Sequence, residues 1–117
     1  METLCKIRDI YTSIEKFEVV FEKEYGLSLN EGMLLCTLLE IKSLSSTELA
    51  RKLGLTCSNT SKVIKSIEGQ NFIERSLGKE DKRQMYFKLT KEGETKIKSI
   101  KTTKIDVPEE LQAILGV

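Results

Sequence analysis

The sequence of 117 residues contains no histidine and only three cysteines. Histidine is the commonest general base near neutral pH and a frequent zinc ligand, so its absence argues against both kinds of site. Cys5, Cys36 and Cys57 lie far apart and form no Cys-x-x-Cys pair, which predicts reduced thiols. No spacing of the remaining carboxylates and lysines places a nucleophile beside a base. We therefore expect neither an enzyme nor a protein that holds a metal or cofactor.

Long apolar runs, internal repeats and low-complexity linkers are also absent. No run approaches the roughly 20 apolar residues that span a bilayer. The first ten residues include Glu2, Lys6, Arg8 and Asp9, and they show no signal-peptide core or small-residue cleavage site. Apolar residues make up 39% of the chain and charged residues 32%. This composition predicts one globular domain, which we expect in the cytoplasm.

Charge is distributed unevenly, although the formal net charge is only +1. Residues 1–44 hold 5 basic and 8 acidic side chains, whereas residues 45–92 hold 10 basic and 6 acidic side chains. Residues 93–117 hold four of each sign. A local excess of basic residues favours a nucleic-acid partner more than the small net charge suggests.

Apolar spacing predicts a long helix from Leu4 to Tyr25, with Gly26 as its stop. The apolar stripe of this helix is wide for so small a domain. One interpretation is that the stripe simply covers the core. The other, which we favour, is that part of it packs against a second copy of the chain.

Two capping-box sequences predict the next two helices. Ser28 and Glu31 open a helix to about position 41, which is apolar nearly all round and is therefore expected to be buried centrally. Ser45 and Glu48 open a short helix over 45–53, and Gly54 ends it. A tight turn at this glycine leads directly into another helix.

This next helix, from about Cys57 to Gln70 with Thr56 as N-cap, completes a helix-turn-helix. Its inward face is apolar, while small polar and lysine side chains on the outward face suit the major groove of DNA. The inward residues are Thr60, Val63, Ile64 and Ile67, and the outward residues are Ser58, Asn59, Ser61, Lys62, Lys65 and Ser66.

A two-stranded wing is predicted over residues 72–89, with strands at 72–77 and 84–89 and a charged tip between them. Arg83 is the candidate for the minor groove, because a guanidinium is weakly hydrated and suits a narrow, electronegative groove. Asp81 would brace the wing by pairing with Arg83 or Arg75. Lys79 and Lys82 are further candidates for contact with DNA.

The chain after the wing predicts two more helices. Thr90 caps the first, with Ile97 and Ile100 inward, and Val107-Pro108 interrupts it. Pro108 then suits the first turn of a short helix that carries Leu111, Ile114 and Leu115. The fold class is therefore mainly α with a small β wing.

Residues 28–93 resemble the DNA-binding core of the MarR family of bacterial transcription regulators. The matching stretches are Leu27-Ser28-Leu29-Asn30-Glu31, Leu44-Ser45-Ser46-Thr47-Glu48-Leu49-Ala50-Arg51-Lys52-Leu53-Gly54-Leu55, Phe72-Ile73-Glu74-Arg75, Asp81-Lys82-Arg83 and Leu89-Thr90-Lys91-Glu92-Gly93. The resemblance covers over half of the chain and keeps the order and spacing of these motifs.

The resemblance implies a winged helix-turn-helix repressor that binds a palindromic operator as a homodimer and is released by a small ligand or by thiol oxidation. It implies a helical dimerisation region from residues 1–27 and 94–117 around the core at 28–93. The sequence departs from the family at Thr60, where an apolar residue is usual. It also departs after Gly93, because only 24 residues follow. This short end makes the helix from Leu4 to Tyr25 the larger candidate for the dimer contact.

Two other functions remain open from the sequence. One is a regulator that senses oxidants through Cys5 or Cys57, the latter lying at a helix start where the helix dipole favours a thiolate. The other is a winged helix that contacts proteins instead of DNA, which the modest net charge allows. The basic segment and Arg83 favour DNA.

Overall fold

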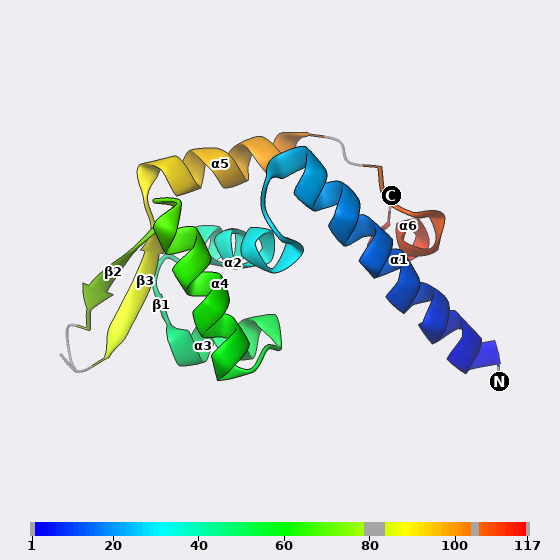
Figure 1. Cartoon of the computed structure of the whole chain (residues 1–117), viewed down its shortest axis with the longest axis horizontal. Coiled ribbons are helices and arrows are strands. Elements are labelled where there is room, and N and C mark those ends of the chain that lie inside the picture. The colour runs from blue at the N-terminus through cyan, green and yellow to red at the C-terminus, as the bar shows by residue number, and fades with distance from the viewer. Residues whose placement is uncertain (1, 79–83, 104–105, 117) are drawn as a thin grey trace. The chain divides into compact units, whose positions relative to one another are not determined.

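The computed structural model describes residues 2–78, 84–103 and 106–116. The elements confirm the expected class, mainly helical with a small antiparallel wing. Their order is α1 (Glu2–Tyr25), α2 (Leu29–Glu40), β1 (Leu44–Ser45), α3 (Ser46–Leu53), α4 (Cys57–Gly69), β2 (Ile73–Leu77), β3 (Met85–Leu89), α5 (Lys91–Thr102) and α6 (Glu109–Leu115) (Figure 1). The chain forms two compact units, one from Met1–Leu29 with Lys104–Val117 and the other from Asn30–Thr103.

In the first unit, α6 packs against α1 (Figure 1). Ser13 of α1 is 3% exposed, and its hydroxyl donates to Glu110 Oε2 of α6 at 3.2 Å. The next residue of α6, Leu111, is buried. The wide apolar stripe predicted for α1 is present, and much of it is exposed in the single chain. The exposed apolar side chains of the two helices are Leu4, Ile7, Tyr11, Val19, Val20, Ile114 and Leu115.

In the second unit, α3 begins at the predicted capping box. Ser45 Oγ accepts from the Glu48 backbone N–H at 3.2 Å, and Glu48 Oε1 accepts from the Ser45 N–H at 3.0 Å. This backbone hydrogen bond lowers the pKa of the Glu48 carboxyl, because it stabilises the ionised form. Gly54 then adopts the left-handed conformation, with φ of 67°, that reverses the chain toward α4.

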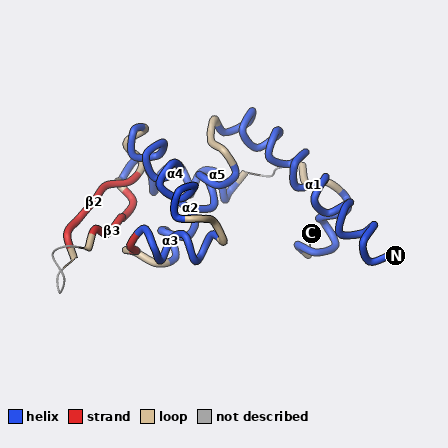
Figure 2. The backbone as a smooth tube through the Cα atoms, turned by 60° about the horizontal axis from the view of Figure 1, so that its bottom comes forward, coloured by secondary structure: helices blue, strands red, loops and turns tan. Residues whose placement is uncertain are grey.

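The sheet has three strands in the order β1-β3-β2, all antiparallel, whereas two were expected. The predicted wing strands are confirmed as β2 and β3 (Figure 2), with Arg75 opposite Phe87. The additional strand, β1, pairs Leu44 with Phe87 and Ser45 with Tyr86. It ties the start of α3 to the base of the wing. A strand of two residues has no periodicity that sequence reasoning could detect.

Gly93 allows α5 to approach the start of the wing closely. A Cβ built at this position would lie 1.9 Å from the Phe72 carbonyl oxygen, so a side chain cannot fit without moving the backbone. The same carbonyl accepts from the Thr90 N–H at 3.0 Å. Thr90 caps α5 as predicted, because its hydroxyl oxygen accepts from the Gly93 N–H.

The expectation that α2 is buried nearly all round is only partly correct. Leu34, Leu35 and Leu38 are at most 1% exposed and form the core, but Met33 is 39% and Ile41 36% exposed. The helix also ends at Glu40, so Ile41 lies outside it. No helix in the described part of the chain is long and apolar enough to cross a membrane.

Candidate nucleic-acid interface

The turn between α3 and α4 orients the second helix of the helix-turn-helix. The Leu55 N–H donates to the Ala50 carbonyl at 3.0 Å and closes the end of α3. Thr56 is the N-cap of α4 as predicted, and its hydroxyl oxygen accepts from the Asn59 N–H at 3.0 Å. Local hydrogen bonds therefore determine where α4 begins.

The two faces of α4 differ sharply in burial. Thr60, Ile64 and Ile67 are at most 3% exposed and contribute to the core. The buried Thr60 hydroxyl donates to the Thr56 carbonyl at 2.8 Å, which satisfies it and explains how a polar residue replaces an apolar one there. The opposite face carries the sequence-predicted candidates, which are all exposed: Ser58, Asn59, Ser61, Lys62 and Lys65.

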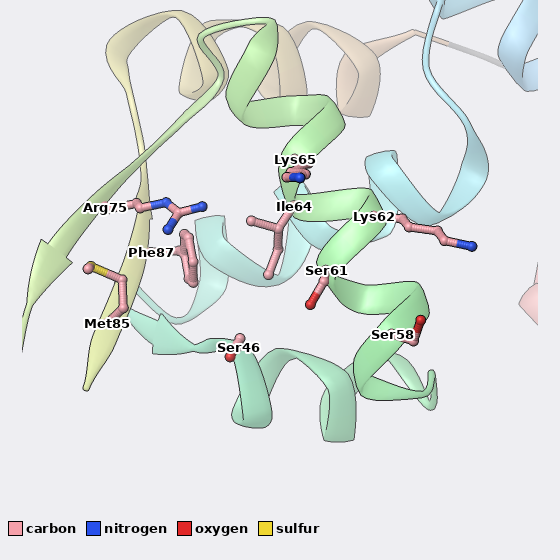
Figure 3. A pocket seen from close by; sticks show the side chains of 9 residues that line it. All are labelled: Ser46, Ser58, Ser61, Lys62, Ile64, Lys65, Arg75, Met85 and Phe87. Carbon is pink, nitrogen blue, oxygen red and sulfur yellow. The ribbon is translucent and has the colours of Figure 1, made fainter. Parts of the chain in front are cut away.

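A groove of about 610 Å³ runs between α4 and the wing strands. Figure 3 shows its lining, with Ser61 pointing into the space between α4 and the strands and Lys62 extending away from the strands. Its lining residues are Ser46, Ser58, Ser61, Lys62, Ile64, Lys65, Arg75, Met85 and Phe87. Hydroxyl and cationic groups from α3, α4 and β2 therefore surround one concave surface.

Arg75 of β2 forms a two-pronged ion pair with Glu68 near the end of α4. The Arg75 Nε lies 2.5 Å from Glu68 Oε2, and its Nη2 lies 2.9 Å from Glu68 Oε1. The guanidinium also lies 5.4 Å from the centre of the Phe87 ring. The hydrogen bonds to Arg75 lower the pKa of the Glu68 carboxyl, and the same bonds raise the pKa of Arg75.

Ser66 links α4 to α2. Its hydroxyl donates to Glu31 Oε2 at 2.5 Å, and Gln70 Nε2 donates to the same oxygen at 3.2 Å. Glu31 lies in the first turn of α2 and is 8% exposed. Ser66 is exposed, as predicted for the outward polar face, and its hydroxyl in addition anchors α4 to α2.

The tip of the wing lies outside the described residues. The predicted DNA contacts of Lys79, Lys82 and Arg83 and the predicted brace at Asp81 concern residues of this segment. Arg75, one of the two partners predicted for Asp81, pairs with Glu68 in the part of the chain that the structure describes.

Sequence reasoning missed several residues of this surface. Ser46, Met85 and Phe87 line the groove because β1 and β3 pair beside α4. Glu68 was also missed, because its partner Arg75 lies seven residues further along the chain, beyond the turn between α4 and β2.

The cysteines and acidic residues form no second site in the described residues. Cys5 and Cys57 are exposed and Cys36 is partly buried, all as free thiols. Within residues 2–78, 84–103 and 106–116, no group of three or more acidic or thiol side chains is arranged to hold a metal ion.

A helix-turn-helix with one exposed polar face, followed directly by an antiparallel hairpin, defines a winged helix-turn-helix protein. Residues 27–85 match the sequence profile of the MarR family. The chain therefore belongs to the MarR family, which comprises transcription regulators and not enzymes.

Two curated relatives are HTH-type transcriptional regulators. YwaE of Bacillus subtilis is 25% identical over 104 residues, which cover 86% of this chain and 61% of YwaE. Hpr of Bacillus pumilus is 32% identical over 85 residues, which cover 73% of this chain and 41% of Hpr. The chain thus spans about half the length of these relatives.

Solved structures show the same fold. BldR of Sulfolobus solfataricus, a transcriptional regulator, is 21% identical with a TM-score of 0.76, and the match covers 98% of this chain and 90% of BldR. MepR of S. aureus, solved in a complex with DNA, is 18% identical with a TM-score of 0.67, and the match covers 82% of this chain and 79% of MepR.

Proposed function

We propose that this chain binds double-stranded DNA sequence-specifically as a homodimer and represses transcription. The observation that carries the proposal is the division of α4 into two faces. Thr60, Ile64 and Ile67 fix one face in the core, and the other presents only small polar and lysine side chains around Ser58 to Lys65. A helix held in this way can enter the major groove without steric hindrance.

The residues of the exposed face have different roles in this proposal. Asn59 can form two hydrogen bonds with adenine, while Ser58 and Ser61 can donate to or accept from either base type. Lys62 and Lys65 lie three residues apart on the same face and contact phosphates. Base contacts would provide the sequence specificity, and phosphate contacts most of the affinity.

The wing contributes the second DNA contact. Arg83, supported by Asp81, enters the minor groove next to α4, and Lys79 and Lys82 contact the flanking phosphates. The described stem supports this role because β2 and β3 extend from the end of α4 toward the tip. MepR shares this fold and was solved with DNA, which supports the same use of the fold here.

A homodimer would give the operator its symmetry. The exposed apolar residues of α1 and α6, such as Leu4, Tyr11 and Ile114, are the surface that a second copy would cover. A two-fold dimer requires a palindromic site with half-sites about one helical turn apart. Replacing Tyr11, which is 68% exposed, with glutamate should produce a monomer in sedimentation, whereas Glu15→Gln should not.

The test is a titration of the chain into labelled DNA from upstream of its own gene. Fluorescence anisotropy is read at two salt concentrations with an excess of unrelated duplex. The proposal predicts salt-sensitive binding that survives the competitor. Binding that the competitor removes would contradict specificity for this operator, and the absence of binding at either salt would favour a protein-contact role.

A further inference from the structure

The Glu68–Arg75 pair joins the recognition helix to the wing. Arg75 uses Nε and Nη2 at 2.5 and 2.9 Å from the two carboxylate oxygens of Glu68, which is the fork geometry that constrains both groups most strongly. The Glu68 side chain is 25% exposed and that of Arg75 is 48% exposed. The pair is therefore neither fully solvated nor deeply buried.

The position of this pair gives it influence over the whole wing. The chain leaves α4 through Asn71, which has a left-handed φ of 64°, and β2 starts two residues later. Arg75 lies at the middle of β2, directly opposite Phe87 of β3, and its guanidinium covers that ring. A constraint at Arg75 therefore acts on both strands beyond the turn.

A second ion pair of the wing provides a contrast. Lys88 Nζ lies 3.4 Å from Glu74 Oε1, and both side chains are 52% exposed. This pair joins β2 to β3 and makes no connection to α4. Among the residues that the structure describes, Glu68–Arg75 is the ion pair that connects α4 with the wing strands.

The charge of Glu68 is unfavourable for a DNA-binding surface unless it has another role. Glu68 is one helical turn beyond Lys65, so its carboxylate would repel phosphates near that lysine. Removing this negative charge should strengthen DNA binding if electrostatics alone decides. A positioning role for Glu68 predicts the opposite result, that removing the charge weakens DNA binding.

We propose that Glu68 and Arg75 are positioning residues that hold the wing at a fixed angle to α4 and so set the spacing of the two DNA contacts. This rests on the proposed DNA-binding function. The ion pair limits the motion of β2 and β3 about the Asn71 turn before DNA arrives. The wing then loses less conformational freedom when the chain binds DNA, and this increases the affinity for DNA.

The first test compares operator affinities of the full chain and isosteric variants. Glu68→Gln should weaken binding about three- to tenfold despite the loss of a negative charge. Arg75→Lys, which keeps the charge but loses the fork, should weaken it similarly, and the double variant should be little worse than either. The matched control, Glu74→Gln, should bind as tightly as the unaltered chain or more tightly. Equal or tighter binding by Glu68→Gln would overturn the proposal.

The second test does not depend on DNA. Amide hydrogen exchange of β2 and β3 should be about threefold faster or more in free Glu68→Gln than in the unaltered chain, and unchanged in Glu15→Gln on α1. If the unaltered chain binds no operator, the proposed function fails, and wing exchange alone decides the positioning role. Unchanged exchange in Glu68→Gln would then overturn it.

Discussion

Ser66 of α4 donates a hydrogen bond to the buried carboxylate of Glu31 in α2, with an Oγ to Oε2 distance of 2.5 Å. Together with Gln70, which donates to the same oxygen, it anchors the second half of α4 to the core helix. A buried carboxylate that loses a donor is costly, because water cannot easily replace it. The orientation of α4 therefore depends on a polar contact between its second half and α2.

Ser66→Ala removes one donor from Glu31 and should lower the free energy of unfolding by about 1–2 kcal/mol. Urea denaturation monitored by circular dichroism measures this change. Ser61→Ala on the exposed face of the same helix is the control and should change stability by less than about 0.5 kcal/mol. Equal effects of the two variants would show that the Glu31 contact contributes nothing.

The sequence predicted those features that depend on near neighbours in the chain. Ser45, Thr56 and Thr90 cap helices as expected, because each N-cap contacts a backbone N–H three residues later.

Features that depend on distant segments were not predictable in this way. The contact of Ser66 with Glu31 spans 35 residues, and the pairing of Leu44 with Phe87 spans even more of the chain. Arg75 was predicted as one of two alternative partners of Asp81, whereas its partner among the described residues is Glu68 at the end of α4. Folding brings these groups together, and no periodicity in the sequence records it.

Gly93 and Gly69 form a matched pair for testing the packing of α5 against the wing. Gly93→Ala places a Cβ against the Phe72 carbonyl and should destabilise the chain by about 2–3 kcal/mol. Gly69 ends α4 with open space around it, so Gly69→Ala should stabilise the chain by about 0.5–1 kcal/mol. Thermal unfolding distinguishes the two changes. A tolerated alanine at position 93 would contradict the close approach.

The capping box of α3 should make stability depend on pH in the acid range. The pKa of Glu48 is lowered in the folded chain, mainly by the Ser45 N–H, so its stabilisation is complete above its ordinary pKa of 4.5 and is lost as pH falls through the lowered value. The difference in unfolding free energy between the unaltered chain and Glu48→Gln should therefore shrink below about pH 4.5. Urea titrations across this range measure it, with Glu18→Gln on α1 as control. A difference that stays constant with pH would contradict the role of the ionised carboxylate.

The central claim, that the exposed face of α4 contacts DNA, is tested most directly by the salt dependence of operator binding in lysine variants. Lys62→Ala and Lys65→Ala should each weaken binding and reduce the slope of log affinity against log salt by about 1, because each removes one phosphate contact. Lys101→Ala, an exposed lysine of α5, should leave the slope unchanged. Slopes for both α4 variants equal to that of the unaltered chain would show that this face does not contact DNA.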